Sequence, residues 1–259
     1  MFQRKPSKSS PVPLRKKTLI IISVTFVILF VVLYITSEFV LLKSFIKLEK
    51  QEVGNEVNRT LNIISNVILN IDDSTSDWAQ WDETYNFIKD GNENYINVNM
   101  VAASFTNLKV NLMVLINESG QIRFSKGFDL HKEEPTPVPQ SLIKVLSIHN
   151  PLLHHPNKKS SITGIVLLPE GPVLIASRPI LTGKEEGPVR GTLIMGRYLD
   201  SSETKRLTKI IRLPVTIHRL SGEQLSSDLQ TTADDLLSKK SSIIARPFNN
   251  NFIVGYNLA

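Results

Sequence analysis

The sequence predicts an α+β fold that follows one N-terminal membrane helix. Two observations predict the fold class: strand patterns separated by short turns, and helical patterns that stand before and between them. Antiparallel neighbours joined by short turns, with helices packed on a face of the sheet, form the usual α+β arrangement. A third observation, an uncharged apolar run near the N-terminus, predicts the membrane helix.

Residues 18–37 form this apolar run, which contains no charged side chain. About 20 such residues are needed for a helix that crosses a hydrocarbon core of roughly 30 Å. A cleaved signal peptide has a shorter apolar core, of roughly 7 to 15 residues, so we interpret the run as an uncleaved anchor. Six cations precede it and Glu38 follows it. By the positive-inside rule, the basic tail 1–17 is cytoplasmic and the residues after 38 lie outside a prokaryotic cytoplasmic membrane.

The net charge of +6 is local to the N-terminal tail. Six of the 30 basic residues lie in the first 17 positions, which leaves 24 basic and 24 acidic residues in the rest of the chain. A balanced exterior does not indicate a nucleic-acid-binding groove. The chain has no cysteine, which excludes disulfides, thiolate metal sites and a cysteine nucleophile.

A long stalk helix is predicted over residues 38–71. Apolar residues recur there at spacings of four and three, with polar residues between them, which gives the helix one apolar stripe. Two interpretations stay open: the stripe packs on its own domain, or it pairs with a second subunit to make a homodimer, as in a coiled coil. The stripe consists of Val53, Val57, Leu61, Ile64, Ile68 and Ile71.

A separate α+β domain is predicted over residues 72–200. It begins with a helical pattern that ends at Asp90-Gly91-Asn92, where the turn residues interrupt it. Strand patterns bounded by turn residues follow, with one short helix between them. The strand patterns are 112–116, 122–124, 161–168, 173–179 and 191–197, and the helix is 140–148.

Residues 201–259 are predicted to form a partial second α+β unit. A helical pattern at 202–212 precedes strand patterns at 215–219, 243–245 and 251–256. The last pattern has no evident partner strand, so we expect this unit to be truncated and the chain to be part of a longer protein.

The stretch DWAQWDETYNF, residues 77–87, contains both tryptophans of the chain. Helical spacing places Trp78, Trp81 and Tyr85 on one face, with Asp82 one turn after Trp78. Large aromatic side chains at this spacing usually form core. They can also form the wall of a pocket in which Asp82 holds a cationic or hydroxylated ligand, and the two roles are compatible.

Two sequence blocks stand in a recognisable order. The first contains Trp78, Trp81, Asp82, Tyr85, Tyr95, Asn99, Leu108 and Asn111; the second reads SRPILTGKEEGPVRGTLIMGRYLD. Together they resemble the extracellular sensory domain CHASE, type four, of bacterial and archaeal receptors. The resemblance covers residues 60–215 and implies a PAS-like or Cache-like fold that senses an unidentified stimulus. It also implies that a second membrane span and an output domain, a histidine kinase or diguanylate cyclase, usually follow such a domain.

Two arginines are further ligand candidates. Arg178 and Arg197 end apolar strand patterns, where a guanidinium can hold a carboxylate or phosphate with two parallel hydrogen bonds. A salt bridge at the rim of the sheet is the alternative for each. Asn99, Asn107 and Asn111 are expected to cap helices or bind the backbone of loops rather than contact a ligand.

Catalytic and metal motifs are absent from the sequence. It contains no Gly-x-Ser-x-Gly, no phosphate-binding glycine loop and no His-Glu-x-x-His. His149, His154 and His155 lack an acidic or thiol ligand at motif spacing, so we expect a solvated loop and no metal. The Asp72-Asp73 pair is expected to lie on the surface.

These observations predict an extracytoplasmic ligand-sensing region of a transmembrane receptor, with no enzymatic activity or cofactor of its own. The ligand is a small molecule or an envelope component, and its predicted site consists of Trp78, Trp81, Asp82, Tyr85, Arg178 and Arg197. The alternative is a membrane-anchored envelope interaction protein without a small-molecule ligand. A broad exposed apolar patch over a filled core would favour that alternative.

Overall fold

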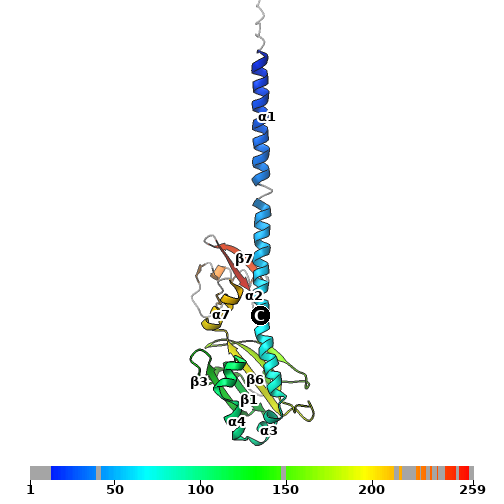
Figure 1. Ribbon diagram of the computed structural model, residues 1–259, viewed down its shortest axis with the longest axis vertical. Coiled ribbons are helices and arrows are strands. Elements are labelled where there is room, and N and C mark those ends of the chain that lie inside the picture. Colours follow the sequence, from blue (N-terminus) through cyan, green and yellow to red (C-terminus); the bar gives the residue numbers. More distant parts are fainter. Residues whose placement is uncertain are drawn as a thin grey trace, which may run out of the picture. The chain divides into compact units, whose positions relative to one another are not determined.

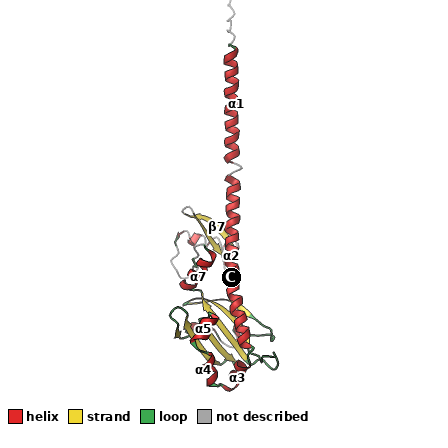
Figure 2. Ribbon diagram, in the orientation of Figure 1, coloured by secondary structure: helices red, strands yellow, loops and turns green. Residues whose placement is uncertain are grey.

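The computed structural model describes residues 13–38, 42–146, 150–212, 243–248 and 251–256, with a few positions between 216 and 238. The chain forms two compact units, one made of Met1–Val57 with Leu225–Ala259 and the other of Asn58–Gln224. The predicted strand pattern 215–219 lies largely outside the described residues, as does His149. Figure 1 labels the elements along the chain, and Figure 2 separates helices from strands.

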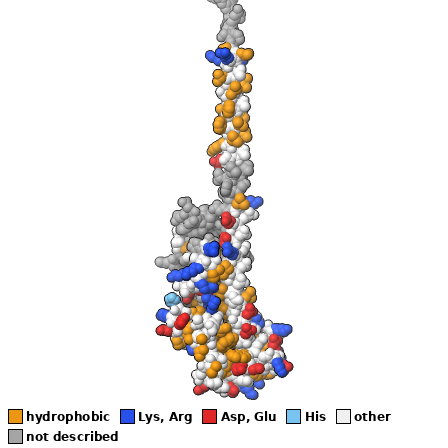
Figure 3. All heavy atoms as spheres, in the orientation of Figure 1, with side chains coloured by type: hydrophobic (Ala, Val, Ile, Leu, Met, Phe, Trp, Pro, Cys, Tyr) orange, Lys and Arg blue, Asp and Glu red, His pale blue; other side chains and the backbone are white. Residues whose placement is uncertain are grey.

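The first unit contains the predicted membrane helix and a β-hairpin. Helix α1 (Leu14–Thr36) is long and apolar enough to cross a membrane, and every residue in it is exposed. Hydrophobic atoms cover its length in Figure 3. Strands β7 (Ile243–Phe248) and β8 (Asn251–Tyr256) pair antiparallel. The last strand therefore has a partner, and the expectation that it lacks one is wrong.

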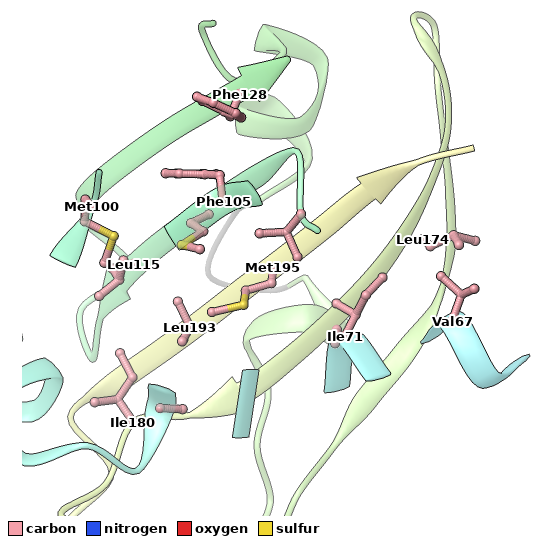
Figure 4. Packing of buried hydrophobic residues seen from close by; sticks show 14 of the residues in the cluster. Val67, Ile71, Met100, Phe105, Leu115, Phe128, Leu174, Ile180, Leu193 and Met195 are labelled. Carbon is pink, nitrogen blue, oxygen red and sulfur yellow. The ribbon is translucent and has the colours of Figure 1, made fainter. Parts of the chain in front are cut away.

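Helix α2 (Leu42–Ala79) is a single helix of 38 residues. The apolar stripe in its C-terminal part packs on the sheet of the second unit. Ile64 and Ile71 of the stripe are buried there, together with Val67. Figure 4 shows Val67 and Leu174 of the sheet facing one another. For this part of the stripe, packing on its own domain is the observed arrangement. No side chain is described at Val53.

A six-stranded antiparallel sheet forms the centre of the second unit, in the order β3-β2-β1-β6-β5-β4. The five predicted strands are all present, and the proline-rich segment adds β3, which the sequence did not predict as a strand. The β1–β2 hairpin turns through Gly120, whose positive φ of 78° suits a glycine. The strands are β1 (Leu112–Asn117), β2 (Ile122–Asp129), β3 (Glu134–Thr136), β4 (Ile162–Leu168), β5 (Gly171–Pro179) and β6 (Gly191–Tyr198).

Helices cover one face of this sheet and a smaller group of elements covers the other. The first layer holds α2, α3 (Asp82–Asp90), α4 (Glu93–Asn99), α5 (Ala102–Leu108) and α7 (Ser201–Ile211), and the second holds α6 (Gln140–Val145) and the 3₁₀ helix η2 (Pro151–Leu153).

Side chains alternate between these two layers, as the twofold period of a strand requires. In β1, Met113 and Leu115 join the core under α2, whereas Leu112, Val114 and Ile116 join the core under α6. The sheet is therefore buried on both faces.

The helical pattern of residues 72–90 breaks where the sequence predicts continuity. Helix α2 ends at Ala79 and α3 begins at Asp82, because Trp81 is extended (φ −94°, ψ 132°). The carbonyl of Ala79 accepts a hydrogen bond from the backbone of Leu181, which replaces the next bond of the helix. The predicted end of the pattern is confirmed: Gly91 caps α3 in the left-handed conformation.

Candidate functional site

The α2–α3 junction brings the two sequence blocks together. The loop 180–190 connects β5 to β6 and contacts the junction through its backbone and through Arg190. Gly183 donates its N–H to Asp82 Oδ1 at 2.9 Å, and Arg190 Nε donates to Tyr85 Oη at 3.1 Å. Two of the six predicted ligand residues, Asp82 and Tyr85, thus hold this loop in place.

The two tryptophans have different surroundings: one packs against the core and the other lies at the surface. Their rings meet edge to face, with centroids 5.7 Å apart and an interplanar angle of 69°. Trp78 is partly buried against the main core, whereas Trp81 remains 39% exposed. The prediction of one shared buried face is wrong, because the helix breaks at Trp81 and this ring stays exposed.

Trp81 borders an open hollow of about 420 Å³ between α3 and α4. Tyr95 lies at this hollow with its hydroxyl 2.8 Å from Thr84 Oγ1 and its ring stacked on Phe87 at 4.8 Å. Burial raises the pKa of Tyr95 to about 12, so the phenol is neutral at physiological pH. The lining residues are Trp81, Glu83, Asn86, Phe87, Asp90, Asn92, Asn94, Tyr95, Val98 and Asn99.

Arg178 connects the sheet to α2. Its guanidinium donates from Nε to Asp72 Oδ1 at 2.6 Å and from Nη2 to Asp72 Oδ2, while Ser161 donates to Asp72 Oδ1 at 2.9 Å. Asp72 is 6% exposed, so the expectation that it lies on the surface is wrong. A buried carboxylate needs such partners, because an unpaired charge in the interior is strongly unfavourable.

Arg197 forms a second buried ion pair, with Glu203 of α7. The Nη2–Oε2 distance is 2.7 Å, and Glu203 also accepts two hydrogen bonds from Arg206. Burial lowers the pKa of Arg197 although Glu203 acts in the opposite direction. Asp200 caps α7: its Oδ1 accepts a hydrogen bond from the backbone N–H of Glu203 at 2.8 Å. This cap fixes the backbone at Glu203, the residue whose carboxylate binds Arg197.

The structure does not bring the two predicted arginines together. Arg178 pairs across the sheet with Leu193, four residues before Arg197 on β6. At about 3.3 Å per residue, the two positions lie ~13 Å apart along the ladder. Each guanidinium has its own carboxylate partner, which is the arrangement that the salt-bridge alternative described.

His155 lies beside the first ion pair and is partly buried rather than solvated. Its Nε2 is 3.3 Å from Ser177 Oγ and its Nδ1 is 3.2 Å from Ser160 Oγ. Burial, with smaller effects of His154 and Arg178, lowers the pKa of His155 to about 4. The ring is therefore neutral at pH 7. Among the described residues, no group of acids and histidines could hold a metal ion.

The side chain of Asn111 forms hydrogen bonds with main-chain groups, as predicted. Its amide donates to the carbonyl of Phe128 at 3.0 Å and accepts from the N–H of Tyr198 at 3.0 Å, which connects β2 and β6 at the start of β1.

Sequence reasoning missed Asp72, Glu203 and His155 as buried polar residues. A signal was present for Asp72, which follows Ile68 by four residues and so continues the apolar stripe. No comparable periodicity marks His155, since it lies in an irregular segment.

A solved structure has a similar fold. The extracellular domain assigned to the histidine kinase vpHK1S-Z8 matches with a TM-score of 0.50 at 12% identity, over 78% of this chain and 84% of that one. A domain of a sensory box/GGDEF family protein from Vibrio parahaemolyticus matches with a TM-score of 0.46 at 14% identity, over 61% and 63%. The second unit thus has a fold that the extracellular domain of a histidine kinase also adopts.

The chain belongs to the CHASE4 domain family, whose model matches residues 63–218. The methanogenesis regulatory histidine kinase FilI of Methanothrix harundinacea is 31% identical over 163 residues, which are 63% of this chain and 18% of that protein. The chain thus spans about a fifth of the length of this relative. Family and fold together make it an extracellular sensing region of a receptor.

Proposed function

We propose that the chain is the input region of a transmembrane receptor whose output domain is a histidine kinase or a diguanylate cyclase. The similarity to a histidine kinase supports this proposal. The sensor itself has no enzymatic role in it, since catalysis belongs to the output domain. The proposed organisation is tail 1–17, span 18–37, stalk 38–71, sensor 72–200 and membrane-proximal unit 201–259.

The proposed topology has the N-terminus in the cytoplasm and the residues after 38 outside. The six cations before the span support this orientation. A periplasmic reporter enzyme, such as alkaline phosphatase, fused after Ala259 is expected to be active. A reporter active only in the cytoplasm would reverse the orientation.

One observation supports the proposed signalling role: two separate contacts bind the C-terminal end of the 38-residue helix α2 to the rest of the sensor. Asp72 is bound by Arg178 of β5, and the end of the helix at Ala79 is bound by the loop 180–190. A ligand that changes the position of the sheet or the loop therefore changes the position of α2. Its effect is limited to its differential affinity for the two arrangements, and a tenfold shift requires about 1.4 kcal/mol.

Pairing of two subunits along the N-terminal part of α2 is part of this proposal. Val57 and Leu61 are the candidate contacts, because both are only partly buried, whereas Ile64 is buried in its own domain. We expect Val57→Asn and Leu61→Asn to reduce crosslinking through a cysteine introduced at Leu48, which is 62% exposed. Asn62→Ser on the exposed side of the helix is the matched control.

The native chain has no cysteine, so crosslinks arise only from the introduced residue. The experiment uses the full chain in membranes. Unchanged crosslinking in both apolar-to-asparagine variants would contradict pairing along this part of the helix and leave α2 as packing for its own domain.

The predicted ligand site also remains a proposal, and the geometry narrows it. Asp82, Tyr85, Arg178 and Arg197 each have a partner within the chain, so Trp81 is the predicted residue that the fold leaves most available. A ligand at the α3–α4 hollow would contact the element that follows the end of α2.

A further inference from the structure

The hollow between α3 and α4 combines an exposed aromatic ring with acidic and amide side chains. Trp81 is 39% exposed and Val98 is 61% exposed, while Tyr95 at the same hollow is 5% exposed. A hollow lined by apolar side chains with a few polar groups among them is typical of ligand sites.

The charged side chains that line the hollow are all acidic. Glu83 and Asp90 contribute carboxylates, four asparagines contribute amides, and the lining contains no lysine, arginine or histidine. Within the described part of the chain, the carboxylate of Glu83 has no hydrogen-bond or ion-pair partner, and Asp90 accepts only from the backbone of Asn92, at 2.9 Å. These carboxylates favour a cation over an anion, although the guanidinium of Arg123 lies beside Gly91, next to Asp90.

The backbone on both sides of Trp81 is fixed. Ala79 accepts a hydrogen bond from Leu181, Asp82 accepts one from Gly183, and the ring of Trp81 contacts Trp78 edge to face. A ring held in this way loses little freedom when a ligand binds, which favours binding. The face of a tryptophan ring is the best aromatic partner for an ammonium group.

We propose that this hollow binds a small organic cation, an amine or a quaternary ammonium compound, with Trp81 against the cationic group and Glu83 and Asp90 supplying the opposite charge. The proposal rests on the proposed sensing function and names the ligand class for it. It differs from the six-residue site predicted from sequence, because it uses the side of Trp81 that faces α4 and involves neither arginine.

Trp81 lines this hollow, and Trp78, the other tryptophan of the chain, contacts its ring. Intrinsic fluorescence of the full-length protein in detergent micelles therefore reports on the hollow. The cationic probe is choline, and its matched neutral control is 3,3-dimethyl-1-butanol, which has the same shape without the charge. Glucose tests a neutral hydroxylated ligand, and succinate tests an anion. We expect a saturable change with choline and at least about tenfold weaker binding of the neutral alcohol.

The double variant Glu83→Gln with Asp90→Asn is expected to bind choline about tenfold more weakly, since both charges are removed while hydrogen-bonding groups remain. Trp81→Leu is expected to weaken binding about two- to fivefold, measured by calorimetry because this variant changes the fluorescence. Glu186→Gln, on the loop 180–190 and outside the lining, is the control and should bind as the parent does.

Equal binding of choline and its neutral isostere would overturn the proposal. So would a stronger response to glucose or succinate, the absence of any saturable response to choline, or parental affinity in the double variant. Circular dichroism of each variant confirms that it is folded. None of these results changes the reporter and crosslinking experiments, which test the receptor function without a ligand, so the failure of either proposal is distinguishable from that of the other.

Discussion

Two buried ion pairs at different points of the β5–β6 ladder connect the sheet to different helices. Among the described residues, Asp72 of α2 has one cationic partner, Arg178, and one hydroxyl donor, Ser161. Glu203 of α7 has two cationic partners, Arg197 and Arg206. The first carboxylate therefore depends on a single guanidinium, whereas the second keeps a cation if either arginine is lost. The helix that we propose to transmit the signal is held by the less redundant of the two contacts.

Arg178→Ala is expected to have the largest effect, a loss of about 3 to 5 kcal/mol in the free energy of unfolding. It leaves the buried carboxylate of Asp72 without a cation. The measurement is denaturant unfolding of the full chain in detergent. As a control, Asp72→Leu combined with Arg178→Met should recover most of the loss, because an apolar pair of similar volume often replaces a buried ion pair at little cost. If the unfolding free energy of Arg178→Ala lies within about 1 kcal/mol of the parent value, the buried ion pair does not hold α2 as described.

Acidification from about pH 6.5 to about pH 4 is expected to destabilise the sensor through His155. The unfolded chain binds a proton on this ring below about 6.5, whereas the folded ring has a pKa of about 4. The unfolded state therefore binds more protons in this window, and stability falls as the pH falls. Because the ring keeps some contact with solvent, we expect at most about 2 kcal/mol.

His155→Gln should flatten this part of the stability–pH curve while keeping hydrogen-bonding groups near Ser160 and Ser177. If the unfolding free energy of the variant has the same slope against pH as that of the parent, the pH dependence comes from groups other than His155.

Arg197→Ala is expected to cost about 1 to 2 kcal/mol, which is less than Arg178→Ala, since Arg206 still neutralises Glu203. The same unfolding measurement applies. The double variant Arg197→Ala with Arg206→Ala should be destabilised by more than the sum of the two single variants, because only then is the carboxylate unpaired. Strict additivity would show that the second pair is not redundant.

Asp82→Asn is expected to have the smallest effect, below about 1 kcal/mol. The bond to Gly183 is exposed, and the amide oxygen of asparagine can still accept it. Asp82→Leu removes the acceptor and should cost more than Asp82→Asn. If both variants match the parent in unfolding free energy, the contact between the junction and the loop contributes nothing to stability.

The sequence predicted most of the sheet because each strand shows a short apolar run bounded by glycine, proline or asparagine. The turn at Gly120 and the cap at Gly91 were predicted for the same reason. The β3 strand was missed, since a three-residue segment of Glu134–Thr136 that contains proline has no strand pattern. The break at Trp81 was missed as well, because it depends on hydrogen bonds from a loop a hundred residues further along the chain.

The candidate site was less predictable than the fold. Helical spacing correctly gathered Trp78, Trp81, Asp82 and Tyr85 in one region, but which side chains face inward depends on the loop 180–190. The partner of Arg178 lies on a helix far away in sequence, so no local pattern identifies it. The partner of Arg197 lies on the next helix of the chain, but no spacing in the sequence marks Glu203 as buried. The ligand residues themselves stay predictions, and the structure supplies the hollow beside Trp81 as the place to test them.

Hydrogen exchange of the full chain tests the central claim, that Arg178 specifically holds α2 to the sheet. Amide exchange in the 59–79 part of α2 and in α7 is compared for the parent, Arg178→Ala and Arg197→Ala under native conditions. We expect faster exchange in α2 with α7 unchanged for Arg178→Ala, and the reverse for Arg197→Ala. Equal acceleration of both helices by either variant, or no acceleration of α2 by Arg178→Ala, would contradict the account.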